Sequence, residues 1–247
     1  SVYEGNVSDS KTLMPEVKRL REDFGIEQFV LVGDRGMISS KAIAELREND
    51  GIGWITALKS VSIRALVEQG QLQLGLFDER NLVELSSPEY PGERLVACRN
   101  PELAKLRAHK RAELLAATEA KLDKIKARVD VGKLVGSDEI GLCVGKVINQ
   151  YKVAKHFELS IDDNAFTFAR KLHAIAAEAA LDGIYIIRTT LPAAQMDAPS
   201  CVRNYKSLAQ VERAFRSLKT VDLKVRPIHH RKADRARAHM LLSRRAE

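Results

Sequence analysis

The chain has 247 residues and carries 40 Lys and Arg against 33 Asp and Glu, which gives a formal net charge of +7 at pH 7. This length suffices for a buried core in one domain with an insertion, or in two domains. The sequence has neither a run of about eighteen apolar residues nor a signal-peptide pattern, so we expect a soluble cytoplasmic protein and exclude a membrane protein.

The positive charge is concentrated at the C-terminal end. Residues 203–247 hold 13 Lys and Arg and 4 acids, a net charge of +9, which leaves −2 for the residues before them. Cations placed along phosphates gain affinity through counterion release, so this segment favours a nucleic-acid surface, although a solvated tail has the same composition. Three separated cysteines without a C-x-x-C argue against a zinc module and fit a reducing cytoplasm.

The first sixty residues alternate between short apolar runs and amphipathic stretches. The apolar run FVLVG is short enough to be a buried parallel strand, and it ends at Asp34. Alternating strands and helices indicate an α/β unit, and such sheets bind ligands at the carboxyl ends of their strands. The expected elements are a strand ending near residue 3, a helix over 10–24, a strand over 28–33, a helix from 39 or 40 to 48 and a strand over 53–58.

Asp34 has several interpretations at this stage. It is a simple turn or cap residue, a ligand of a metal site, or the Mg²⁺-binding Asp of a nucleotide hydrolase. The hydrolase is poorly supported, because no G-x-x-x-x-G-K-[ST] phosphate loop occurs in the sequence.

The middle of the chain interrupts this α/β unit. Its turn signals and apolar periodicity predict two hairpins and several helices. The expected elements are a hairpin over 82–85 and 95–98, a long amphipathic helix over 101–129, a helix over 137–150, a hairpin over 155–161 and 165–170, a helix over 171–181, a strand over 184–188 and a linker over 192–200.

A helix is predicted over residues 203–220, where apolar residues recur every three or four positions. Glu212 is its only acid, among the cations Lys206, Arg213, Arg216 and Lys219. One interpretation is an amphipathic surface helix in which Glu212 pairs with Arg216. The other is a carboxylate held ionised by its neighbours in a site that binds phosphates and a divalent metal. The predicted packing stripe is Leu208, Val211, Phe215 and Leu218.

The spacing of this helix resembles a known signature. Tyr205, Glu212 and Lys219 follow one another at intervals of seven, as in the Y-R-E-K signature of bacterial insertion-sequence transposases with a DDE active site. The signature's Arg is Leu208 here, so Arg213 or Arg216 would have to supply its phosphate contact. Nearly the whole chain shares the resemblance, through the ordered segments GNVSDSKTL, LVGDRGMISS, LDGIYIIRTTL, YKSLAQVERAFRSLK and VRPIHHRKADRARAH.

The resemblance implies an α/β fold with an incomplete RNase H-like core, interrupted by a mixed helical and β-hairpin insertion. It places the second catalytic Asp at Asp34 and the catalytic Glu at Glu212, which together would hold Mg²⁺ or Mn²⁺. The first catalytic Asp would precede Ser1, and the C-terminal apolar helix of the family gives way to LLSRRAE, so we expect a fragment that is inactive alone. The residues expected to contact DNA are Tyr205, Arg213, Arg216, Lys219 and Arg35.

The predicted function is Mg²⁺-dependent DNA cleavage and strand transfer at transposon ends, with DNA as partner and, from the resemblance alone, a homodimer in the complete protein. The alternative is a non-catalytic DNA-binding protein that uses the basic C-terminal segment. The predicted domains are an N-terminal core part over 1–58, an insertion over 59–182, a C-terminal core part over 183–240 and a truncated tail over 241–247.

Overall fold

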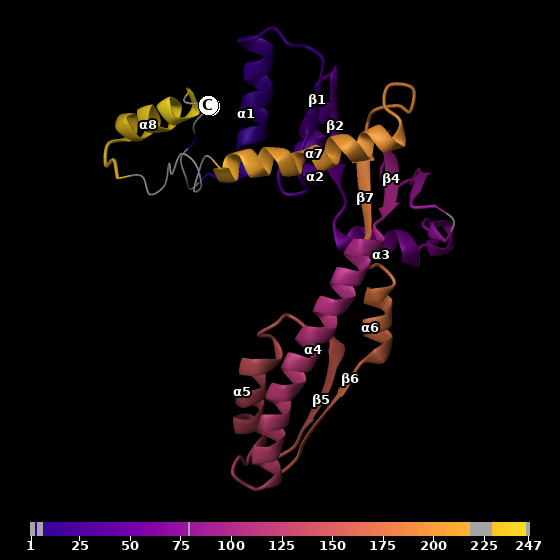
Figure 1. The fold of residues 1–247 in the computed structure, drawn as a ribbon, viewed down its shortest axis with the longest axis vertical. Coiled ribbons are helices and arrows are strands. Elements are labelled where there is room, and N and C mark those ends of the chain that lie inside the picture. The colour runs from indigo at the N-terminus through magenta and orange to yellow at the C-terminus, as the bar shows by residue number, and fades with distance from the viewer. Residues whose placement is uncertain (1–2, 4–6, 79, 218–228, 246–247) are drawn as a thin grey trace. The chain divides into compact units, whose positions relative to one another are not determined.

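The computed structural model describes residues 3, 7–78, 80–217 and 229–245 (Figure 1). The described residues form two compact units. The first unit lies within Ser1–Cys98 and Tyr185–Glu247, and the second unit is Arg99–Ile184. No described helix is long and apolar enough to cross a membrane.

The first unit is built on a five-stranded mixed sheet with the strand order β1-β2-β7-β4-β3. β1 is parallel to β2, whereas β7 is antiparallel to β2 and β3 is antiparallel to β4. Central strands β2 and β7 are almost completely buried, while β1 at the edge is only half-buried. The strands are β1 (Phe29–Val32), β2 (Ile52–Ala57), β3 (Leu82–Leu85), β4 (Arg94–Arg99) and β7 (Ile184–Thr189).

Helices cover both faces of this sheet. Successive residues of a strand point to opposite faces, and the neighbours Trp54 and Ile55 of β2 belong to different apolar clusters. Trp54 packs with α1 and α2, whereas Ile55 packs with α7, which crosses the sheet and contacts β1, β2 and β3 (Figure 1). The helices of this unit are α1 (Asp9–Glu22), α2 (Ser40–Arg47), α3 (Ser60–Glu68), the 3₁₀-helix η1 (Leu74–Phe77), α7 (Ala198–Arg216) and α8 (Ala233–Arg245).

The second unit packs two helices against an antiparallel hairpin. Its long helix α4 contacts α5 and β6, and its core contains Leu122, Ile140 and Phe166 (Figure 1). The hairpin pairs β5 with β6 in the register Leu159 opposite Phe168. The elements are α4 (Pro101–Asp130), α5 (Ser137–Ile148), the 3₁₀-helix η2 (Ala154–His156), β5 (Phe157–Ile161), β6 (Phe166–Arg170) and α6 (Leu172–Ala179).

Most predicted elements are confirmed within a few residues, including α4 and both hairpins. Three differences stand out. α3 and η1 follow β2 where no element was expected, and α8 runs into the predicted tail. α7 begins at Ala198 inside the predicted linker, because Asp197 caps it and Pro199 suits the first turn of a helix.

The structure also relocates one hairpin. Residues 82–99, which the sequence analysis placed in the insertion, form β3 and β4 of the sheet in the first unit. The compact second unit correspondingly begins at Arg99. The observed fold is mixed α/β, and the predicted strand end at residues 1–2 lies outside the described residues.

Candidate active site

Asp34 begins the loop that follows β1. Its Oδ1 accepts hydrogen bonds from the backbone N–H groups of Gly36, at 2.9 Å, and Met37, at 2.7 Å. One oxygen of the carboxylate thus has the role of a turn residue. Its two hydrogen bonds also fix the orientation of the Asp34 carboxylate. Oδ2 accepts no hydrogen bond from the described residues, and the side chain is exposed, so this oxygen is available to a ligand.

α7 is anchored through its N-terminal half. The Asp197 carboxylate accepts a hydrogen bond from the Ser200 N–H at 2.7 Å, and this capping interaction holds the pKa of Asp197 below its usual value. Ala198, Cys201 and Val202 are buried in the core on that face of the sheet. The first turns of the helix are thus fixed against the sheet.

The predicted packing stripe is only partly correct. Leu208 is half-buried, but Val211 is 49% exposed and Phe215 is 50% exposed, so their predicted burial is wrong. Leu218 lies outside the described residues. The stripe that does pack consists of residues one to three turns earlier, because burial depends on which turns of the helix lie on the sheet, and helical periodicity does not encode that position.

The hydroxyl group of Tyr205 is influenced by charges of three predicted site residues. Its ring is half-buried against the core, and burial raises the pKa of its hydroxyl group. The Asp34 carboxylate raises this pKa further, the Arg35 guanidinium opposes the rise, and the Glu212 carboxylate adds to it. Tyr205 and Glu212 are seven residues apart on α7, which at about 100° per residue places them on one helix face. Charged side chains from the β1 loop and from α7 therefore influence the same hydroxyl group.

The other residues expected to contact DNA are exposed where the structure describes them. Arg35 is exposed on the Asp34 loop. Arg213 and Arg216 are exposed in the last turns of α7, where they lie about 100° and about 40° around the helix from Glu212, both on the same side of it. Lys219 lies outside the described residues.

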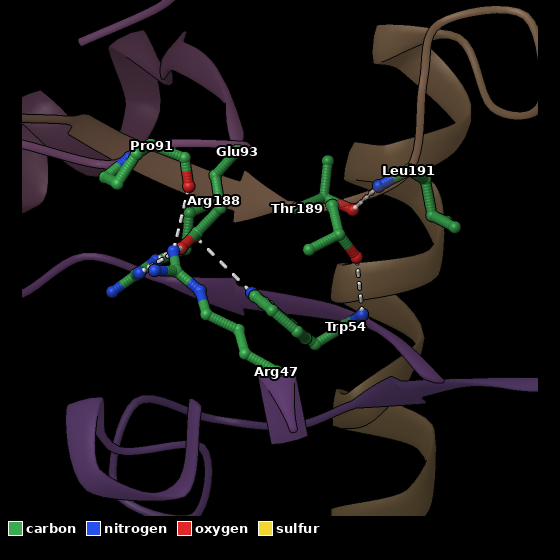
Figure 2. Close-up of polar contacts among 8 residues, drawn as sticks. Arg47, Trp54, Pro91, Glu93, Arg188, Thr189 and Leu191 are labelled. Carbon is green, nitrogen blue, oxygen red and sulfur yellow. Dashed lines mark hydrogen bonds and ion pairs between the residues drawn. The ribbon is translucent and has the colours of Figure 1, made fainter. Parts of the chain in front are cut away.

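Glu93 is the centre of a cluster of ion pairs and hydrogen bonds beside β2 and β7, as Figure 2 shows. The Glu93 carboxylate is completely buried and accepts two hydrogen bonds from Arg188, both at 2.5 Å, and one from Arg47 at 2.6 Å. The Trp54 indole N–H is 3.4 Å from the same carboxylate. Thr190 Oγ1 accepts the Trp54 backbone N–H at 3.1 Å. Sequence reasoning missed Glu93, whose setting between Pro-Gly and a strand reads as an exposed turn.

A divalent metal fits the donor chemistry of Asp34 and Glu212. Carboxylate oxygens suit Mg²⁺ and Mn²⁺, and Mg²⁺ is commonly held by one or two carboxylates, waters and substrate phosphates. Among the described residues no group of three or more His, Cys, Asp or Glu side chains lies close enough to form a metal cage. Asp34 and Glu212 are thus not grouped with a third such side chain among the residues that the structure describes.

Comparison with known proteins gives the family. A family model described as Transposase DDE domain matches residues 1–246. No curated protein and no solved structure shows significant similarity to the chain. The match extends over nearly the whole sequence and agrees with the mixed α/β fold. The chain therefore belongs to the DDE transposase domain family.

Proposed function

We propose that the first unit is an RNase H-like catalytic core that cleaves DNA at transposon ends and joins it to a target in a reaction dependent on Mg²⁺ or Mn²⁺. Membership of the DDE transposase domain family implies DNA cleavage and strand transfer in transposition. The observation that carries the assignment of the site is the shared electrostatic influence of Asp34, Arg35 and Glu212 on the Tyr205 hydroxyl group.

The metal would be held by one carboxylate on a sheet-edge loop and one on a helix. When bound, divalent ions activate the attacking water or 3′-hydroxyl and stabilise the leaving oxygen in phosphoryl transfer. Asp34 is oriented for this role by its two backbone hydrogen bonds. Glu212 is exposed, so its carboxylate reaches the site without loss of a packing contact.

Tyr205 and nearby arginines would position the DNA. The raised pKa keeps the Tyr205 hydroxyl protonated, so it donates a hydrogen bond to a phosphate oxygen. Arg35, Arg213 and Arg216 would neutralise neighbouring phosphates with charge-assisted hydrogen bonds. We further propose that the protein acts as a homodimer in the cytoplasm and associates with the nucleoid when bound to DNA.

Cleavage of the polypeptide by bound iron tests the shared metal site. Fe²⁺ replaces Mg²⁺ in the intact chain, and peroxide then cuts the backbone next to the ion. We expect two cuts, near residues 34 and 212, which Mn²⁺ suppresses by competition. Asp34→Asn and Glu212→Gln should each weaken both cuts, whereas the control Asp138→Asn/Glu139→Gln on α5 should change neither. Loss of only the local cut in each variant would contradict a shared site.

The alternative function is DNA binding without catalysis. It rests on exposed cations just before and within the first turns of α8, namely Arg231, Lys232, Arg235 and Arg237. In that case Asp34→Ala/Glu212→Ala binds DNA with unchanged affinity both with and without Mn²⁺. The catalytic proposal instead requires Mn²⁺ to strengthen DNA binding by the natural chain more than by this variant. A purely structural protein would show no salt-dependent DNA binding at all.

A further inference from the structure

The second unit has a basic surface of its own on one flank of α4. Lys121, Lys124 and Arg128 follow one another at intervals of three and four residues, which places them on one side of the helix. Lys152 lies in the loop after α5, is exposed, and directly follows Tyr151, which Lys121 contacts. We call these four residues the α4 basic ridge.

Acidic groups do not neutralise this ridge in the part of the chain that the structure describes. The acids of α4 pair on its other flank: Glu119 binds Arg170 of β6, and Asp130 binds Lys126. Asp123 lies about 100° around the helix from Lys124. On α5, Asp138 and Glu139 occupy the first turn, where they favour the positive end of that helix dipole, and neither forms an ion pair with the ridge.

Lys121 is held in place by uncharged groups. Its Nζ donates to the Tyr151 hydroxyl oxygen at 2.9 Å and lies 4.6 Å from the centre of the Tyr151 ring, and it also donates to Gln150. These contacts fix the ammonium group but leave its charge uncompensated. Lys124 and Arg128 are exposed one turn apart, which places like charges in a mutually repulsive arrangement.

Lys152 occupies an unusual backbone conformation. Its φ of 58° is the only positive φ found at a residue other than glycine among the described residues. This left-handed region suits Gly or Asn better than Lys, and such strain is found more often at functional positions. Lys152 is exposed and directly follows Tyr151, the residue that Lys121 contacts.

The ridge has the dimensions of a phosphate backbone contact. Seven residues separate Lys121 from Arg128, which corresponds to a rise of about 10 Å along the helix. One strand of duplex DNA advances about 3.4 Å per phosphate, so the ridge spans about three phosphates. Four uncompensated cations, with no apolar patch between them, suit a polyanion backbone and carry no groups arranged to read base edges.

We propose that the α4 basic ridge binds the phosphate backbone of duplex DNA without sequence preference and gives the second unit its own contact with DNA. The partner class rests on the proposed function of the first unit, but the surface is separate from Asp34 and Glu212. Each cation that neutralises a phosphate contributes about 0.9 to the slope of log K against log salt concentration.

Salt-dependent binding to a duplex by the full chain tests this proposal. Lys124→Gln/Arg128→Gln removes two ridge charges, whereas the control Lys105→Gln/Lys126→Gln removes two α4 lysines that pair with Glu102 and Asp130. The ridge variant should lower the salt slope by about 1.8 on any duplex sequence, and the control should leave it within about 0.5 of the natural value. Thermal midpoints of both variants should stay at the natural value or rise slightly in the ridge variant, since a like-charge repulsion is removed.

The outcomes separate the two proposals. Equal salt slopes in the ridge variant and the control would overturn the ridge while leaving the first-unit proposal standing. Absence of any salt-dependent binding by the natural chain would overturn both. If the ridge variant lost binding to anionic phospholipid vesicles but bound DNA like the natural chain, the ridge would belong to a membrane-binding surface. That result would also overturn the proposal. A salt slope that falls for one duplex sequence only would contradict backbone recognition.

Discussion

Removal of the buried Glu93 charge should destabilise the first unit far more than removal of its partly exposed partner Arg47. The Glu93 side chain is completely buried, Arg188 is 11% exposed and Arg47 is 40% exposed. Glu93→Gln leaves Arg188 buried without a counterion, and breaking a buried pair in this way costs about 3–5 kcal/mol of unfolding free energy. Arg47→Gln removes a cation that is already partly solvated, so its cost should be about 1 kcal/mol or less.

Trp54 makes this prediction measurable in one unit of the chain. It is the only tryptophan of the sequence, and it lies beside Glu93, so its fluorescence reports unfolding of the first unit. With a urea dependence of about 2 kcal/mol per molar, Glu93→Gln should lower the unfolding midpoint by about 1.5–2.5 M and Arg47→Gln by about 0.5 M. Adding Arg188→Met to Glu93→Gln should recover part of the loss, because an apolar replacement leaves no unpaired charge. The reasoning is refuted if the two single variants shift the midpoint equally.

Three further predictions concern other groups. Glu212→Gln should lower the pKa of Tyr205 towards 10, since one of the negative charges that raise it is removed; NMR titration of the tyrosine ring carbons checks this, and an unchanged pKa would separate Glu212 from the site. Burial lowers the pKa of His156 below 6.5, so just below pH 6.5 the unfolded chain binds a proton at His156 more readily than the folded chain does. The free energy of unfolding of the second unit should therefore fall as the pH drops below 6.5, with a flatter profile for His156→Gln in circular-dichroism melts between pH 5 and 7. Gly183 has a φ of 76° and an added Cβ would overlap a backbone carbonyl oxygen, so Gly183→Ala should cost more than about 1 kcal/mol, whereas Gly145→Ala inside α5, where no atom is near, should gain up to about 1 kcal/mol in the same melts.

The parts of the fold that depend on neighbours in sequence could be predicted. α4 shows helical periodicity after a strong N-cap at Asn100, and the β5–β6 hairpin turns at a run of Asp and Asn, so both were expected close to their observed bounds. The order of the strands could not be predicted, because β7 pairs with β2 across more than a hundred residues. The same limit explains why the place of the hairpin over 82–85 and 95–98 in the sheet could not be predicted, since its partner strand β7 is remote in sequence.

The candidate site divides in a similar way. Asp34 could be chosen because it ends an apolar strand, and Glu212 because it is the only acid among cations. Their common influence on the Tyr205 hydroxyl group depends on how α7 crosses the sheet, which periodicity does not reveal. The burial of Glu93 could not be predicted from its sequence neighbours, because its ion-pair partners come from α2 and β7, which are remote in sequence.

α7 is packed against the sheet through its N-terminal turns, so a small tilt of the helix moves its C-terminal residues furthest. Its fixed end lies at Ala198 to Val202, whereas Glu212 lies about 10 Å beyond Tyr205 along the helix axis. A tilt of about 5° at Tyr205 displaces the Glu212 carboxylate by about 1 Å, a distance that matters for metal chemistry. Under the proposed mechanism, substitutions of buried residues such as Cys201 would change the reaction rate by shifting Glu212, and their effects on rate need not follow their effects on stability.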